Sequence, residues 1–585
     1  MLRPSISVGR WATLAAATLF AQPIWGTEAV TATPERLIAD EIDAAIERKL
    51  QERGVVPAPQ ATDATLVRRL TLDLVGRIPT MREARAYVDS THPAKREELI
   101  ARLMKTPEYI RHNAREFDRL ISGENESAPS LETYLTQAME QRKSWDRIFT
   151  ELVGVGPEPN DDASRFVIGR FGDRDALTRD VSSVFFGVNV SCCQCHDHPS
   201  VDYLTQDFYF GLKAFFHRSY DFNGRLMDRI HSEFLTFKSK DGDDRTARLL
   251  LVSGTSVEIP PVDEEGLPER IAAEDKQIAE TREQFEKQKQ YPESPAVSPR
   301  KLLVDTALKA EERLWLAKSI VNRLWYRFFG HGLVMRVDQM HPENPPSHPE
   351  LLEWLAMDFV EHGYDLHRMM NGLVLSRTFS RSSQWLSEGS PTADLFAVAQ
   401  VRPLTPMQYG LSLRIASRPD LVASFQTDEQ WNQQLLQLEA EAKASFAPLL
   451  PAPTDGLQIG AQEALRLSND PESLKLLGEG LVGSLSPAMS AGERMDRLYW
   501  TVLSRPAEPE ETQAVVTYLQ DALAAIPADL VQTRTSPSKA DDQAISLEGS
   551  VDRPSSDQGA LDRYRSRVQQ VAWALLTGSE FRFNH

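Results

Sequence analysis

Apolar residues recur at helical spacing along most of this 585-residue chain, and this pattern limits the fold to one built mainly from α-helices. Proline and glycine interrupt the pattern and divide it into many separate helices. We expect helices at residues 34–50, 64–74, 81–87, 95–104, 107–120, 131–153, 177–186, 207–216, 308–329, 350–363, 365–373, 406–414, 429–444, 469–478, 492–503, 509–524 and 562–576. The fold class expected from the sequence is therefore mainly α.

Several residues mark the ends of these expected helices. Thr80 and Asp365 are each placed to cap the first turn of the helix that follows. Ser347 and Glu350 have the spacing of a capping box, in which the serine accepts from the Glu350 N–H and the glutamate reaches back. Gly187 is expected to end the helix that leads to the cysteines.

The middle of the chain differs from the helical material on both sides. Residues 234–240 and 245–252 have strand-like composition and flank Asp241-Gly242, a dipeptide typical of β-hairpin turns. Residues 268–290 form a highly charged helical pattern with one narrow apolar seam, made by Ile271, Ile278 and Phe285. We expect a solvent-exposed helix that rests one edge on a neighbour, rather than a coiled coil.

The first residues have the pattern of an export signal. Arg3 and Arg10 precede an apolar run, and small residues near Gly26 offer a cleavage site. We therefore expect residues 1–26 to be a signal peptide and the protein to be periplasmic or extracellular, with no membrane span after cleavage. The net charge of −19 argues against a nucleic-acid partner, because phosphate recognition requires a basic surface.

All three cysteines lie in one short stretch, Cys192, Cys193 and Cys195, and His196 follows directly. Cys192, Cys195 and His196 have the C-x-x-C-H spacing of a c-type haem attachment site. In such a site two thiols bind the haem vinyl groups and the adjacent imidazole becomes an axial iron ligand. Cys193 would be spare.

Two alternatives remain open at this stretch. Cys192, Cys195, His196 and His198 could instead hold zinc or another metal, although ligands so close in sequence crowd a tetrahedron. Two of the cysteines could also form a disulfide beside a lone thiol. If haem binds, candidates for the sixth iron ligand are named by proximity in sequence alone: His217, Met227 and His231. The aromatic residues at 208–216 suit a helix core and could also border a macrocycle.

Several runs of sequence resemble a known pair of domains. Residues 68–74, 195–199 and 209–212 are similar to the planctomycete cytochrome-type domain of unknown function. A second set of runs resembles the planctomycete-specific domain of unknown function that usually follows it: 321–325, 328–334, 345–352, 376–379, 573–576 and 580–585. The resemblance brings no established activity. Many relatives carry a fused cytochrome c domain, which this chain lacks.

The resemblance and the composition together predict a domain order. Residues 1–26 are the signal peptide, and 34–220 are the cytochrome-type helical domain. Residues 221–300 are the hairpin and the charged helix, and 301–585 are the planctomycete-specific helical domain.

A second group of chemistry-bearing residues lies in the later runs: Asn322, Arg323, Trp325, His348 and Arg377. The two arginines could receive carboxylate or sulfate groups through paired donors. Alternatively, the group bonds buried helix ends and loops. No nucleophile elbow, phosphate loop or H-E-x-x-H motif is present, and no catalytic residue can be named.

These observations favour an exported redox component that carries a c-type haem, or another metal, at the C-x-x-C-H stretch and exchanges electrons with an unknown redox or protein partner. The first alternative is a non-catalytic scaffold or binding protein with a structural metal or disulfide there. A third is a polysaccharide-processing hydrolase, for which no residue gives positive evidence.

Overall fold

The computed structural model of the protein describes residues 34–122, 129–156, 161–259, 265–310, 312–446, 480–527 and 555–585. These residues are mostly helical, and their strands occur only as antiparallel pairs. The expectation of a mainly α fold is therefore confirmed. The expected signal peptide at 1–26 and the helix expected at 469–478 lie outside the described residues. None of the described helices has both the length and the apolarity needed to cross a membrane.

The N-terminal helices follow the expected order, with one correction. They are α1 (Pro34–Arg53), α2 (Asp63–Val75), α3 (Met81–Val88), α4 (Lys95–Leu103), α5 (Pro107–Ser122), α6 (Glu132–Glu140), α7 (Trp145–Leu152), α8 (Asp161–Ile168), α9 (Arg174–Asp180) and α10 (Gln206–Ala214). The single helix expected at 131–153 is wrong. A turn separates α6 from α7, and Arg142 adopts a left-handed φ of 49° in that turn.

The middle segment contains paired strands. The hairpin expected around Asp241-Gly242 is confirmed, because β3 (Thr236–Lys238) pairs with β4 (Asp244–Thr246). The single strand expected at 245–252 is wrong, because residues 249–250 form a separate strand, β5 (Leu249–Leu250), which pairs with β6 (Ser256–Val257). A further pair, β1 (Ser219–Phe222) with β2 (Arg225–Asp228), has no counterpart in the expectations.

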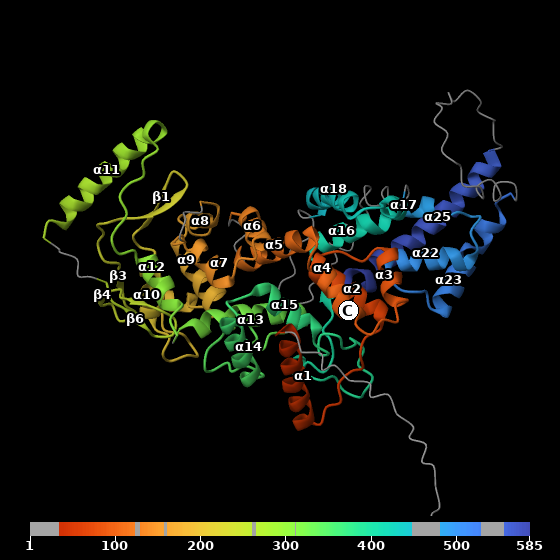
Figure 1. Cartoon of the computed structure of the whole chain (residues 1–585), viewed down its shortest axis with the longest axis horizontal. Coiled ribbons are helices and arrows are strands. Elements are labelled where there is room, and N and C mark those ends of the chain that lie inside the picture. The colour runs from red at the N-terminus through yellow and green to blue at the C-terminus, as the bar shows by residue number, and fades with distance from the viewer. Residues whose placement is uncertain are drawn as a thin grey trace, which may run out of the picture.

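The charged helix is also confirmed as α11 (Leu267–Gln288). Its residue Ile278 is buried against Phe222 and Met227, so one edge of α11 contacts the β1–β2 pair and most of its surface is exposed. Figure 1 places α11 at one end of an elongated molecule.

The C-terminal elements begin after α11. They are α12 (Pro299–Ala307), α13 (Arg313–Phe329), α14 (Pro349–Glu361), α15 (Leu366–Leu375), β7 (Arg402–Pro403), α16 (Pro406–Ser417), α17 (Pro419–Ser424), α18 (Asp428–Phe446), α21 (Leu481–Ser484), α22 (Ala491–Val502), α23 (Pro509–Ala524), α25 (Ser555–Thr577), α26 (Ser579–Arg582) and β8 (Phe583–Asn584). Helices α22, α23 and α25 lie at the end opposite α11 (Figure 1).

The expected caps are confirmed at two of three positions. Thr80 accepts from the Glu83 N–H in a full capping box, and Asp365 accepts from the Arg368 N–H. The capping box expected at Ser347 is wrong. Pro349 is the first residue of α14, so His348 takes the capping position and provides no side-chain cap. The Ser347 hydroxyl instead lies 3.0 Å from His348 Nδ1.

One hydrophobic core runs through both halves of the chain. It combines residues of α1 to α10 with residues of α13, α14 and α15. A second core is formed by the C-terminal helices, and Leu72 and Ile78 from the N-terminal half are buried within it. Both cores therefore contain residues from the two helical domains expected from the sequence.

Two consecutive arginines of α2 bind main-chain oxygens that are distant in sequence. Arg68 donates to the carbonyls of Val502, at 3.2 Å, and Phe581, at 3.0 Å. Arg69 donates to the Arg381 carbonyl at 2.9 Å and to the main chain of His585. Burial lowers the pKa of each guanidinium to about 10, so both remain charged at neutral pH. Charged donors that satisfy otherwise lone buried carbonyls are strong structural contacts.

Asp73, one turn further along α2, completes this set of contacts. Its carboxylate receives a two-pronged hydrogen bond from Arg402, at 3.0 and 2.7 Å, and a third bond from Asn584 at 2.9 Å. The Asp73 side chain is only 5% exposed. Such a buried pair is held by geometry and by its extra hydrogen bonds. α2 therefore joins the N-terminal half to the C-terminal end of the chain.

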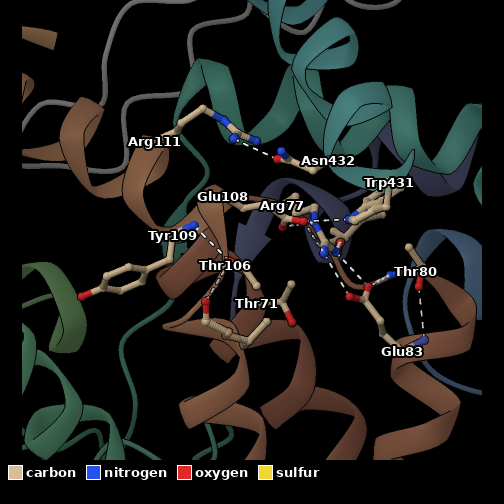
Figure 2. Close-up of polar contacts among 12 residues, drawn as sticks. Thr71, Arg77, Thr80, Glu83, Thr106, Glu108, Tyr109, Arg111, Trp431 and Asn432 are labelled. Carbon is tan, nitrogen blue, oxygen red and sulfur yellow. Dashed lines mark hydrogen bonds and ion pairs between the residues drawn. The ribbon is translucent and has the colours of Figure 1, made fainter. Parts of the chain in front are cut away.

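A second buried ionic cluster lies beside α2 (Figure 2). The fully buried Arg77 bonds Glu83, at 2.8 and 3.0 Å, and Glu108, at 2.8 Å. The Trp431 indole N–H donates to Glu108 at 2.7 Å, and the Arg77 guanidinium lies over the indole ring. Although burial opposes ionisation, Arg77 and Thr80 lower the pKa of Glu83 to about 2. The cluster fastens α18 to the N-terminal helices.

This cluster predicts acid-sensitive stability. The folded protein holds Glu83 ionised well below its ordinary pKa of 4.5, so the stabilisation is fully present above that pH and is lost as the pH falls towards 2. We expect Glu83→Gln to lower the free energy of unfolding at pH 7 by about 3 kcal/mol. Urea unfolding followed by tryptophan fluorescence at pH 7, 5 and 3.5 should show the wild-type and variant values converging as the pH falls.

The control for this measurement is Glu286→Gln, which removes an exposed carboxylate of α11 that pairs only with Lys289. We expect no measurable change for that variant. A Glu83→Gln deficit that stays constant between pH 7 and pH 3.5 would contradict the assignment.

Candidate functional site

The segment that leads to the cysteines is fixed by contacts with the C-terminal half. After α9 the chain forms a π-helical turn at 181–185 and then reaches Gly187, whose φ is +69°. The Gly187 carbonyl accepts from Met340 at 2.9 Å, and the next residue, Val188, pairs with Gln339. A Cβ at position 187 would lie 3.3 Å from Ser319 Oγ, so glycine suits both the backbone angle and the close approach.

The cysteines lie on a short 3₁₀ turn at Ser191–Gln194. Cys193 points into the core, is fully buried, and donates its S–H to the Leu204 carbonyl at 3.4 Å. Burial, together with the nearby Cys192 thiol, raises the pKa of Cys193 to about 12. The cysteine that seemed spare in the sequence is therefore the anchor of the turn, and its thiol is protonated at neutral pH.

The other two cysteines have the opposite environment. Cys192 and Cys195 are both exposed, and none of the three cysteines forms a disulfide. His196 is exposed as well, and its backbone N–H donates to the Cys192 carbonyl at 3.3 Å. The His196 Nδ1 lies 2.6 Å from the Asp197 carbonyl oxygen, a contact that requires the proton on Nδ1. That tautomer leaves Nε2 with a lone pair, the usual state of a histidine that ligates a metal.

Neighbouring side chains hold this turn in place. The Asp197 carboxylate accepts from the Gln206 N–H at 3.3 Å and from Lys240, which comes from the hairpin insertion. The bond from Lys240 lowers the pKa of Asp197. The Gln206 side chain donates to the Gln194 carbonyl and accepts from the Lys240 N–H at 2.7 Å. The hairpin and α10 therefore both brace the C-x-x-C-H stretch.

The structure brings a third histidine, His341, to this stretch from the C-terminal half. The rings of His198 and His341 lie 5.6 Å apart between centroids, at 59°. The buried His341 Nδ1 has no hydrogen-bond partner among the described residues. Burial lowers the pKa of both rings, and a neighbouring histidine lowers it further: His196 acts on His198, and His198 acts on His341. His341 was absent from the expected site, and its only signal in the sequence is its position just before the 345–352 run.

The expected sixth ligands lie in other surroundings. Met227 packs with Phe222 in the small core under α11. His231 lies beside Glu274, with 3.8 Å between the ring and the carboxylate, and burial lowers the pKa of His217. No group of three or more histidine, cysteine, aspartate or glutamate side chains converges as a metal site within the described part of the chain. The four residues named for zinc are therefore not gathered around one point.

Comparison with protein families identifies both halves of the chain. A family model described as PSCyt2, protein of unknown function (DUF1549), matches residues 41–221. A second, described as PSD1, protein of unknown function (DUF1553), matches residues 299–418. The chain belongs to this paired family. The predicted order of the two domains is confirmed. No curated protein and no solved structure matches the chain.

The runs that carried the family resemblance include the interlocking residues. The α2 residues that bond the C-terminal half of the chain all lie in the PSCyt2 domain: Arg68, Arg69 and Asp73. Asp43 of α1 accepts from the main-chain N–H groups of Arg377 and Thr378 in the PSD1 domain, each at 2.9 Å. These family motifs therefore build the junction between the two domains.

The second group of expected site residues occupies separate structural positions. Asn322 bonds both main-chain groups of Val334, and Arg323 donates to the Ser183 carbonyl. Trp325 is fully buried and stacked on a phenylalanine, while burial lowers the pKa of His348 to about 4. Arg377 is half exposed and pairs with two acids of α1. The contacts match the alternative in which the group bonds helix ends and loops.

The aromatic residues of α10 also have core contacts. Phe210 stacks on Phe237 with 4.1 Å between ring centroids. The Tyr209 hydroxyl donates to Asp175, which also pairs with Lys213. The Gln194 side chain of the cysteine turn also donates to Asp175, at 3.0 Å, so this carboxylate links the turn to α10.

The three cysteines are expected to differ in reactivity. Iodoacetamide attacks thiolates, so the buried Cys193, with its raised pKa, should react roughly 100-fold more slowly than Cys192 and Cys195 in reduced, haem-free protein at pH 8. Peptide mass spectrometry after timed alkylation measures each rate. All three sites should react alike once the protein is unfolded in urea. Rapid labelling of Cys193 in the folded protein would show that the turn does not anchor through this thiol.

Proposed function

We propose that the protein is an exported redox component with a c-type haem attached at Cys192 and Cys195. One observation carries the proposal: two exposed thiols three residues apart precede an imidazole whose Nδ1 is already bonded to a carbonyl. This is the donor set that covalent haem attachment requires. The family comparison names no activity, so the proposal rests on this chemistry alone.

The donor set fits haem better than it fits zinc. A structural zinc ion needs four side chains that converge on a tetrahedron, and no three candidate ligands converge in the described part of the chain. Haem attachment instead uses two thioether links and one protein ligand, so its residues can lie along an exposed turn. Access favours it too, because both thiols are on the surface.

Each residue of the turn has a distinct task in this proposal. The thiols of Cys192 and Cys195 would hold the macrocycle, and His196 would supply Nε2 as the axial ligand. The Asp197 carbonyl fixes the tautomer and orientation of that imidazole. Bound haem would supply a one-electron iron centre. Lys240 and Gln206 keep Asp197 and the turn in place, and Cys193 ties it to the core.

Haem at the cysteine turn also has consequences for the compartment of the protein and for the kind of redox partner it would meet. Covalent haem is attached outside the cytoplasm, which agrees with the leader expected at residues 1–26. A haem on an exposed turn would meet a redox partner directly, without a long tunnelling path through the protein. The acidic net charge of −19 suits a partner with a basic docking face.

A second function is favoured by the interlocked domains. The family motifs of α2 and of residues 376–379 take part in the contacts between PSCyt2 and PSD1, as expected of a rigid scaffold or binding protein. In that case the exposed thiols would carry no cofactor.

A measurement of haem content distinguishes the redox function from the scaffold function. We expect full-length protein, matured with its leader in a host that attaches c-type haem, to stain for haem in a denaturing gel and to give a pyridine haemochrome spectrum with about one haem per chain. Cys192→Ala and Cys195→Ala together should abolish the stain. His196→Ala should remove the axial ligand and shift the Soret band of any haem still attached.

Cys193→Ala is the matched control, because it removes a neighbouring thiol that faces the core. It should retain haem. Wild-type protein that matures, is exported and carries no haem would refute the redox proposal and leave the scaffold, and elemental analysis would then show whether that protein holds zinc.

A further inference from the structure

The two exposed cysteines of the turn are arranged as a pair. Cys192 and Cys195 are three residues apart, and the Cys195 backbone N–H donates to the Cys192 carbonyl at 3.4 Å, which closes the 3₁₀ turn. Such a turn has three residues per turn and rises about 2 Å per residue, so side chains three positions apart lie on the same face. The two Cα atoms are therefore about 6 Å apart, within the range of about 4.4–6.8 Å that a disulfide spans.

The fold keeps the third cysteine out of this pair. Cys193 lies about a third of a turn away from Cys192, faces the core and is fully buried. Its thiol donates to the Leu204 carbonyl at 3.4 Å. An oxidant in solution reaches Cys192 and Cys195, which are exposed, and does not reach Cys193. Of the three disulfides that three cysteines allow, the fold therefore favours one.

Neighbouring side chains hold the turn in this shape. Before the cysteines, the Asn189 side chain accepts from the Ser191 N–H at 3.0 Å and donates to Asp338 at 3.0 Å. Within the turn, Gln194 donates to Asp175 at 3.0 Å. Two thiols that are already held together lose little further conformational entropy when they bond. The turn therefore favours an intrachain disulfide over separate bonds to a small thiol.

We propose that Cys192 and Cys195 form a reversible dithiol–disulfide couple in the haem-free protein, which exchanges with low-molecular-weight disulfides. The thiolate of one cysteine attacks a sulfur of the small disulfide, that S–S bond breaks, and one small thiol leaves. The thiolate of the second cysteine attacks the mixed disulfide, forms the bond between the two cysteines and releases the second small thiol. The two cysteines are oxidised and the small disulfide is reduced, and its two sulfurs take the two protons that the cysteines lose.

This activity is separate from the proposed haem function. Thioether links would consume both sulfurs, so the disulfide and attached haem exclude each other at this turn. Protein that carries haem after maturation but forms no disulfide in its haem-free state would refute this inference alone. Protein that forms the disulfide but never carries haem would refute the proposed function alone.

Redox titration of the full-length, haem-free protein tests the couple. The reduced protein is equilibrated at pH 7 in glutathione buffers with a rising share of oxidised glutathione, and the remaining thiols are then alkylated in denaturant for peptide mass spectrometry. We expect Cys192 and Cys195 to become joined in one step, Cys193 to stay reduced, and dithiothreitol to restore both thiols. Separate glutathione adducts on Cys192 and Cys195, a bond that includes Cys193, or no oxidation would overturn the proposal.

The same titration in urea measures what the fold contributes. Unfolding releases the turn, so we expect the equilibrium constant for the intrachain disulfide to fall at least tenfold. Equal constants in the folded and unfolded protein would show that the C-x-x-C spacing alone forms the bond, and would refute the assignment to the folded turn.

Two variants check which sulfurs take part. Cys193→Ala is the matched control, because it removes the buried neighbour and leaves the exposed pair, so it should keep the disulfide. Cys195→Ala should give only a glutathione adduct on Cys192. Loss of the disulfide in folded Cys193→Ala protein would contradict the pairing. Peptide mapping of the wild type identifies the bonded pair even where a variant fails to fold.

Discussion

The buried contacts of α2 are the interaction on which the rest of the structure depends. Arg68 and Arg69 satisfy carbonyls from residues 379 to 585, and Asp73 holds Arg402 and Asn584. Removing these charges from water costs free energy, and their hydrogen bonds offset much of that cost. These contacts hold the PSCyt2 and PSD1 domains together, and one hydrophobic core also contains residues of both domains.

Two buried polar atoms lie close to contacts between the N-terminal and C-terminal halves and have no hydrogen-bond partner among the described residues. One is the Nδ1 of His341, whose ring lies beside His198 of the cysteine stretch, and the other is the hydroxyl of Tyr109 in α5. Most buried polar groups in proteins have a partner, so such exceptions deserve a chemical explanation.

The cysteine turn also shows how the fold gives three identical side chains different environments. Cys193 is buried and bonded to a carbonyl, whereas Cys192 and Cys195 are exposed on the same short turn. Because a 3₁₀ turn places neighbouring side chains about a third of a turn apart, one can face the core while the others face solvent. The C-x-x-C-H spacing singled out Cys192 and Cys195, which are the two exposed cysteines, whereas the position of Cys193 depends on its contact with Leu204.

Local sequence determined the helices, the caps at Thr80 and Asp365, the Asp241-Gly242 hairpin and the charged α11, because each depends on residues a few positions apart. Local sequence gave a wrong capping box at Ser347, because α14 begins at Pro349. It also gave one helix at 131–153, where the chain turns at Arg142. Only the tertiary structure decided which distant groups these side chains contact. Arg68 and Asp73 bond the C-terminal half of the chain. Asn322 and Arg323 bond main-chain groups, and the His341 ring lies beside His198. Those partners lie up to hundreds of residues away, and periodicity carries no information about such distant contacts.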